Sequence, residues 1–308
     1  FTSFEQLQGY LKNDNFYEET QHFKNSFLTS NKALFKAAML YLFSKNHNLK
    51  YYTYFGRGKL KVIVKTIWLN LLEKYRFSYL ENHSIKKLNT SDQLIFLPLH
   101  VDPEGSFLLN ALYFTNQLEV IKHVSKSIPI NYTLIVKEHP LMNTRGWRKK
   151  AFYDEIINLP NVKLISTSIS THDILKKVKL IVTISSTAGL EASFYGKPSI
   201  VLVDTIYDQL PSVTKLDKIS NLSLKIKEAL EKDVHPEDLN SFINLVESKS
   251  FKCDVVGLIT DLTNEFFYNG FLSDVKITDQ HFLNFLNDNS EQFSILANNY
   301  LKLIFPDN

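Results

Sequence analysis

The sequence contains a single cysteine, Cys253, among its 308 residues. One thiol cannot form an internal disulfide, and it excludes a metal site built from several cysteines. We therefore expect a reducing compartment such as the cytosol, where protein thiols stay reduced. A lone cysteine is more often a packed thiol than a nucleophile, and this is the role we expect for Cys253.

Long apolar runs and a strong excess of charge are also missing. No stretch approaches the roughly 18 to 20 apolar residues that a membrane-spanning helix needs, and no secretory signal is visible. The formal net charge is +3, from 35 basic and 32 acidic side chains. So small an excess gives no reason to expect a nucleic acid partner. These absences favour a cytoplasmic protein, and an association with the membrane surface is compatible with them.

Several catalytic and nucleotide-binding motifs are absent. The sequence has neither GxGxxG nor GxxxxGK[ST], which argues against dinucleotide oxidoreductases and P-loop NTPases. It also lacks the GxSxG turn of hydrolases and the HExxH motif of zinc proteases. No Asp-x-Asp motif occurs, and this argues against a metal-held nucleotide-sugar site.

The pattern of apolar residues divides the chain into three ranges. Residues 1–90 predict mostly helices, over 17–45 and 59–80, with a short strand and turn at 49–59. Residues 91–215 alternate helical stretches with short, nearly continuous apolar runs, which suit parallel strands that are buried on both faces. Residues 216–308 again predict helices. The central range therefore predicts an α/β domain with a doubly wound, Rossmann-type parallel sheet.

Polar side chains follow the predicted strands at the end where such sheets bind ligands. The first strand is followed by His100, Asp102 and Glu104, within "HVDPEGS". Carboxylates at such a place can act as a general base or a nucleophile, although Asp before Pro is also common in turns. We rank Glu104 slightly ahead of Asp102.

The next strand ends in "LIVKEHP", so that Lys137 and His139 arrive just before Pro140. Pro140 would fix the direction of the backbone while the His139 imidazole faces a nucleotide. Lys137, with Arg145 and Arg148 beyond it, would add positive charge for an anionic donor. Each of these side chains could equally be solvated.

The stretch "TISSTAGLEASFYGKPSIVL" is the most informative one. It predicts a strand that turns through Ser185 and Ser186 into a helix starting near Thr187, where hydroxyls and backbone N–H groups can bind phosphate. An ordinary serine or threonine helix cap is the alternative. The small Gly189 would allow a ligand to approach closely, and Glu191 could bind ribose hydroxyls or only complement the helix dipole.

These stretches occur in an order that resembles a known group. "FLPLHVDPEGS", "LIVKEHP" and "TISSTAGLEASFYGKPSIVL" together resemble bacterial capsule and surface-polysaccharide biosynthesis proteins. These are similar to GT-B glycosyltransferases and include retaining β-Kdo transferases. The His-Pro and Ser-Ser/Thr pair also resembles bacterial sialyltransferases, in which both motifs contact CMP. The resemblance covers roughly residues 93–204.

The resemblance implies roles for individual residues. His139 and Pro140 would contact the nucleotide, and the run Ser185 to Thr187 would bind its phosphate. Glu104 would match an acidic position near the reacting sugar, and Asp173 is a further acidic candidate, although capping of a helix explains it as well. Only about 90 residues, largely helical, precede the nucleotide-binding half, so the acceptor domain would be reduced or partial.

The sequence therefore predicts a metal-independent glycosyltransferase with no cofactor beyond its nucleotide-sugar donor. It would move a sugar, Kdo or another acidic sugar, from a CMP-activated donor to a glycan or glycolipid acceptor at the cell surface or capsule. A peripheral place at the inner membrane beside other capsule assembly proteins is compatible with this. Two alternatives remain: a phosphotransferase that uses a CDP-polyol, and a non-catalytic module of a capsule assembly complex.

Overall fold

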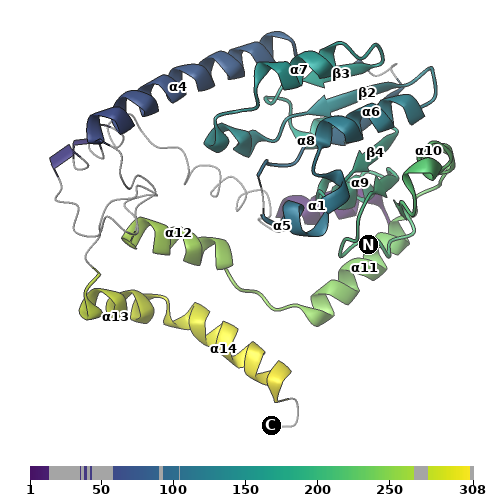
Figure 1. The fold of residues 1–308 in the computed structure, drawn as a ribbon. Coiled ribbons are helices and arrows are strands. Elements are labelled where there is room, and N and C mark those ends of the chain that lie inside the picture. The colour runs from purple at the N-terminus through teal and green to yellow at the C-terminus, as the bar shows by residue number, and fades with distance from the viewer. Residues whose placement is uncertain are drawn as a thin grey trace. The chain divides into compact units, whose positions relative to one another are not determined.

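The computed structural model describes residues 1–13, 35, 38, 39, 42, 43, 58–89, 93–103, 105–266 and 277–305 (Figure 1). The helix expected over 17–45 and the strand and turn expected at 49–59 lie almost wholly outside the described residues, and Glu104 lies outside them as well. By its internal contacts the chain forms two compact units, residues 1–13 with 69–245 and residues 14–68 with 246–308. The sequence-based ranges 1–90, 91–215 and 216–308 are drawn differently and stay a prediction.

The first unit contains the predicted parallel sheet. Its strands are β1 (Leu94–Pro98), β2 (Thr133–Lys137), β3 (Val162–Ile165), β4 (Leu180–Thr183), β5 (Ser199–Val201) and β6 (Val213–Lys215). They lie in the order β3-β2-β1-β4-β5-β6, and every neighbouring pair is parallel. This is the strand order of the Rossmann fold, so the predicted fold class is confirmed. The sequence did not predict β6, because three residues give no readable pattern.

The apolar runs form strands because both faces of the sheet are buried. Ile95 and Leu97 belong to a core cluster that also holds Ile121 of α6 (Gln117–Ser127) and Ile226 of α10 (Leu222–Leu230). Phe96, which alternates with them, is also fully buried. A strand with a helix-covered layer on each side has no polar face, and this explains its nearly continuous hydrophobic sequence.

Further helices connect the strands and are shorter than their sequence patterns suggest. The sequence of 105–127 has one continuous helical pattern, but this range contains α5 (Gly105–Asn110), η2 (Leu112–Phe114) and α6. After β2 come η3 (Pro140–Arg145) and α7 (Lys150–Ile157), and α8 (Thr171–Leu175) follows β3. Between β4 and β5 lies α9 (Ala188–Ser193), and η4 (Ile219–Asn221) precedes α10. These connections are short, and the polar loops begin directly at the strand ends.

Two helices at the front of the chain support this unit. In α1 (Phe4–Asn13), the ring of Phe4 packs against Gly196, where a Cβ atom would come within 3.0 Å of a ring carbon. Gly196 has a φ of 63° and ends the α9 segment. The long helix α4 (Lys59–Asn82) continues from the second unit into the first, and α11 (Pro236–Lys249) continues from the first into the second.

The end of α4 also completes the sheet at the β3 edge. Ile85 forms a parallel bridge with Ile165: its N–H donates to the Leu164 carbonyl at 2.9 Å, and its carbonyl accepts from Ser166 at 3.0 Å. Glu81 then accepts hydrogen bonds from the hydroxyl of Ser166 and from the N–H and hydroxyl of Thr167. Burial raises the pKa of the Glu81 carboxyl, and these hydrogen bonds outweigh that effect, so its pKa is lowered.

The second unit contains the C-terminal helices α12 (Val255–Phe266), α13 (Asp279–Asp288) and α14 (Ser290–Ile304). The sequence of 279–305 has one continuous helical pattern, but the helix is interrupted at Asn289, whose side-chain amide donates to the Phe285 carbonyl at 3.1 Å. Among the described helices of the chain, none has the length and apolar character to cross a membrane.

Candidate functional site

The ends of β1, β2 and β4 form the candidate site. β1 lies between β2 and β4 in the sheet, and the chain order reverses there. Since all three strands are parallel, their carboxyl ends lie at one edge, which is where open α/β sheets bind ligands. The residues brought to this edge include His100 after β1, His139 after β2 and Ser185 after β4.

His100 lies between the two flanking strand ends. Its Nε2 accepts the N–H of Ser185 at 3.3 Å, and its backbone N–H and carbonyl both bind the side-chain amide of Gln117, at 2.8 Å and 3.2 Å. Burial lowers the pKa of His100 to about 4, and the neighbouring His139 and Arg148 add to the effect. His100 is therefore uncharged at neutral pH, and both His139 and Ser185 lie near it. The sequence pattern placed His100 at this edge but gave no sign of this central role.

His139 begins the short helix η3 with a fixed ring orientation. Its Nδ1 accepts the N–H of Leu141 at 3.2 Å, and Pro140 is the first residue of η3. In the neutral ring the proton is therefore on Nε2, which can donate a hydrogen bond. Backbone and ring are both held in place, and the ring caps η3; that it faces a nucleotide stays a prediction.

Glu138 is fully buried directly behind His139. One carboxylate oxygen accepts the backbone N–H of His139 at 2.9 Å, and the other accepts Arg148 Nε at 2.8 Å and the Tyr153 hydroxyl at 3.0 Å. Burial raises the pKa of Glu138, and the Arg148 guanidinium opposes that rise. Burial also raises the pKa of Tyr153, and the adjacent Glu138 adds to the effect. Because both of its oxygens accept these hydrogen bonds, Glu138 fixes the positions of His139, Arg148 and Tyr153 from the buried side of the site.

Arg148 joins the loops that follow β1 and β2. Besides its bond to Glu138, it donates through Nη1 to the Asp102 carboxylate at 3.0 Å and through Nη2 to the His100 carbonyl at 2.6 Å. Its side chain is only 7% exposed, and the guanidinium carbon lies 4.7 Å from the centre of the Phe152 ring. Asp102 is more open, with 42% of its side chain exposed. The predicted positive charge of Arg148 is thus balanced by two carboxylates.

The Ser-Ser-Thr turn after β4 uses some of its polar groups internally. Ser186 receives the N–H of Ala188 at its hydroxyl, at 3.2 Å, and its own N–H donates to the Thr183 hydroxyl at 3.0 Å. Thr187 donates its hydroxyl to Glu191 at 3.0 Å. Neither the Ser185 hydroxyl nor the Thr187 N–H makes a hydrogen bond to any residue that the structure describes. These two groups, together with the Ser186 hydroxyl proton, are donors that the turn can offer to a phosphate.

The helix that follows this turn begins as expected, with Thr187 as its first flanking residue, but α9 has only six residues. A helix this short carries a small dipole, so hydroxyl and N–H donors matter more here than the helix does. Gly189 is buried against Tyr207, whose hydroxyl oxygen would lie 2.8 Å from an added Cβ atom. The Tyr207 hydroxyl donates to the Ser186 carbonyl, and burial raises the pKa of Tyr207. Tyr207 gives Gly189 a packing reason that the sequence analysis missed.

The other predicted polar residues lie in different surroundings. Lys137 is buried, and its amine donates to the Ile169 carbonyl at 2.5 Å, so it ties β2 to the loop after β3. Asp173 exchanges hydrogen bonds with Ser170 at the start of α8, in the capping arrangement that was weighed as its alternative role.

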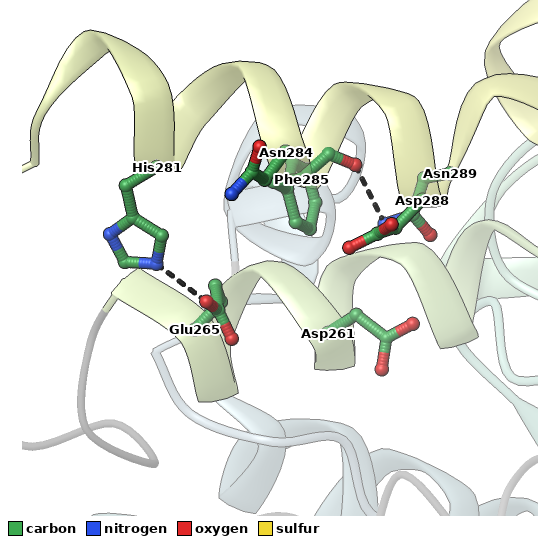
Figure 2. A pocket seen from close by; sticks show the side chains of 7 residues that line it. All are labelled: Asp261, Glu265, His281, Asn284, Phe285, Asp288 and Asn289. Atoms are coloured by element: carbon green, nitrogen blue, oxygen red, sulfur yellow. Dashed lines mark hydrogen bonds and ion pairs between the residues drawn. The ribbon is translucent and has the colours of Figure 1, made fainter.

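The described cavities of the second unit contrast with this edge. A groove of about 350 Å³ runs between α12 and α13, and Figure 2 shows its lining. Glu265 of α12 and His281 of α13 form an ion pair across it at 2.5 Å, and Asp261 and Asp288 also face it. Within the described part of the chain, no group of three or more His, Cys, Asp or Glu side chains is arranged to hold a metal ion.

The fold is that of a Rossmann-type α/β protein, and the candidate residues lie where its strand order reverses, which is where such folds bind ligands. Residues 15–241 match the family described as capsule polysaccharide biosynthesis protein. The chain therefore belongs to that family. A comparison with curated proteins finds no match.

Several solved structures are similar to this chain at low identity. The β-Kdo 2,7 transferase of Thermosulfurimonas dismutans KpsC is 18% identical over 51% of each chain, with a TM-score of 0.34. The UDP-GlcNAc 2-epimerase from Methanocaldococcus jannaschii is 16% identical over 62% of this chain and 52% of that chain, with a TM-score of 0.38. The β-Kdo 2,4 transferase of the same KpsC is 14% identical over 67% of each chain, with a TM-score of 0.35. The chain spans about half the length of the first two.

Proposed function

We propose that this chain is a glycosyltransferase, or the donor-binding part of one, that uses a nucleotide-activated sugar to build a capsular or surface glycan. Membership of the capsule polysaccharide biosynthesis family supports the pathway. The observation that carries the chemistry is the meeting of His139 and Ser185 at His100, on the edge where the strand order reverses. We propose a CMP-linked donor, with Kdo or another acidic sugar, on the resemblance of the His-Pro and Ser-Ser-Thr motifs.

The donor phosphate would lie between the ends of β2 and β4. Nε2–H of His139, the Ser185 hydroxyl and the Thr187 N–H are hydrogen-bond donors, and such donors stabilise negative charge that grows on a leaving phosphate. When the bond between the anomeric carbon and the phosphate oxygen breaks, its electron pair leaves with the nucleotide. A hydrogen bond or proton from His139 would lower the energy of that leaving group. The nucleotide pocket would be shaped by Pro140, Ser186, Gly189 and Glu191. Lys137 would stabilise the wall of this pocket at the end of β2.

Asp102 is the described carboxylate best placed for the reacting sugar. It is half exposed, and Arg148 holds one of its oxygens, so the other can face a substrate. It would accept the proton of the acceptor hydroxyl as that oxygen bonds to the anomeric carbon, or attack that carbon itself. Glu104 stays the second candidate for this role. We propose that the reaction needs no metal, because fixed hydrogen-bond donors would stabilise the charge on the phosphate.

Calorimetry with CMP, UDP and CDP tests the proposal on the wild type and on His139→Ala. We expect the wild type to bind CMP best, and loss of the His139 ring to weaken binding at least about tenfold, which is about 1.4 kcal/mol. His123→Ala, on the exposed face of α6, is a matched control that should bind as the wild type does. If the wild type binds none of the three nucleotides, the proposal is wrong.

A further inference from the structure

The turn between η3 and α7 has an unusual backbone. Gly146 has a φ of 73° and Trp147 a φ of 55°, so two successive residues lie in the left-handed region. Glycine adopts this conformation freely, but a bulky aromatic residue does so only where its surroundings impose it. Trp147 is nevertheless well packed, with only 7% of its surface exposed.

Helix α4 supplies the contacts that hold this turn. Arg76 donates through Nη1 to the carbonyl of Gly146 at 3.0 Å and to that of Trp147 at 3.2 Å. The ring of Phe77 lies 4.9 Å from the Trp147 ring. All four residues belong to the same compact unit. The strained conformation is therefore secured by a helix more than 60 residues earlier in the chain.

Arg148 directly follows this turn, which sets the direction of its side chain. Its guanidinium donates from three nitrogens to three acceptors, which are the carboxylates of Glu138 and Asp102 and the carbonyl of His100. These acceptors lie on the two loops that follow β1 and β2. A planar guanidinium can reach all three at once, whereas a lysine ammonium is a flexible point charge.

We propose that Arg148 is a positioning residue of the nucleotide site and that the Arg76-held turn exists to place it. This inference rests on the proposed function. Arg148 orients the carboxylate of Asp102, and through Glu138 it fixes the backbone N–H of His139. Because each of its three nitrogens already donates to one of these neighbours and its side chain is only 7% exposed, Arg148 acts on the donor sugar through them and not as a phosphate ligand.

The two roles of Arg148 predict different results for a lysine at this position. A direct phosphate contact depends mainly on charge, which Arg148→Lys keeps. A positioning role depends on three fixed hydrogen bonds, which Arg148→Lys loses. Lys149→Arg is the matched control, because it also exchanges one cation for another at the next residue, which is exposed.

The experiment measures CMP binding by calorimetry for the wild type, Arg148→Lys and Lys149→Arg, with thermal melting to confirm folding. We expect Arg148→Lys to weaken binding at least tenfold and Lys149→Arg to change it less than twofold. Binding by Arg148→Lys within twofold of the wild type would overturn the inference.

A second readout needs no nucleotide. In ¹⁵N-histidine spectra the wild-type His139 should show one tautomer, with the proton on Nε2, because Leu141 donates to Nδ1. We expect Arg148→Lys, but not Lys149→Arg, to shift this signal toward an average of both tautomers. If the wild type binds no CMP, the proposed function fails and this spectrum alone decides the inference; an unchanged His139 signal then rejects it.

Arg76→Met keeps the inference testable if Arg148→Lys does not fold. Arg76 is half-buried on α4, so its loss removes the support of the turn and leaves the Arg148 ion pairs in place. We expect CMP binding to fall several-fold and the fluorescence of Trp147 to shift toward the red, measured with Trp68→Phe in the background. Unchanged binding together with unchanged emission would contradict the proposed role of the turn.

Discussion

The sheet edge of the first unit and the groove of the second unit both contain carboxylates paired with cations, but they differ in burial. Glu138 and Arg148 have side chains that are 0% and 7% exposed, whereas Glu265 and His281 are 52% and 31% exposed. At the edge each partner makes further hydrogen bonds, and Figure 2 shows Glu265 and His281 facing each other across the groove between α12 and α13. The pair at the sheet edge is thus buried and hydrogen-bonded on several sides, whereas the pair at the groove is partly exposed.

The difference indicates which region is organised for chemistry. A polar group acts on a substrate without reorganisation only if neighbouring groups already fix it. His139 and Asp102 are fixed in this way by Glu138 and Arg148, which themselves face the core. Substitutions can test this comparison.

The largest effect should come from the buried pair. Glu138→Ala leaves the Arg148 charge in the core with one carboxylate partner fewer, and removing one member of a buried pair costs about 3–5 kcal/mol. Urea unfolding, followed by the circular dichroism of the first unit, measures this. A loss below about 1 kcal/mol would show that water reaches Arg148, and the contrast with the groove would disappear.

The next effect concerns pH. The pKa of His100 is lowered to about 4 in the folded protein from a usual 6.5, so between these values the unfolded chain binds more protons. The free energy of unfolding should therefore fall as the pH drops from about 6.5 to 4, by up to about 3 kcal/mol from His100. Above about pH 6.5, His100 should not make the stability depend on pH. Unfolding of the wild type and of His100→Gln at a series of pH values gives the difference. His123→Gln, at an exposed histidine, is the control, and identical pH profiles for the wild type and His100→Gln would refute the assignment.

A smaller effect is expected where the Ser-Ser-Thr turn meets Tyr207. Gly189→Ala places a Cβ atom 2.8 Å from the Tyr207 hydroxyl oxygen, and overpacking of this kind costs about 1–3 kcal/mol. Tyr207→Phe removes the closest atom, so the double variant should recover part of the loss although the bond to Ser186 is gone. Thermal melting of both single variants and the double variant measures the coupling. Additive losses would mean that Gly189 and Tyr207 do not press on each other.

The smallest effect belongs to the groove. A double-mutant cycle with Glu265→Gln and His281→Gln should give a coupling of about 0.2–1 kcal/mol at pH 6, because water and salt screen exposed pairs. Raising the salt concentration should reduce it further. A coupling above about 2 kcal/mol would mean that the pair is buried from solvent. The groove would then be as well organised as the sheet edge, and the comparison would fail.

Sequence patterns predicted the strands well, because both faces of the sheet are buried and the strands show as apolar runs. They also brought His139 and the Ser185 turn to one edge, since parallel strands end at the same side of a sheet. They could not assign Arg148, because its direction depends on the left-handed Gly146–Trp147 turn and on Arg76 of a distant helix. Tyr207 stayed hidden for a similar reason, because it contacts the turn from a separate loop.

The bridge between Ile85 and Ile165 has a practical consequence for anyone who shortens this chain. The unpaired backbone groups of a terminal strand attract strands of other molecules, and natural sheets cover or interrupt such strands. Here a few residues after α4 occupy that position beside β3 and are anchored by Glu81. A fragment that starts at residue 91 would keep every named strand of the sheet and lose this cover, and we expect it to self-associate and precipitate in proportion to its concentration.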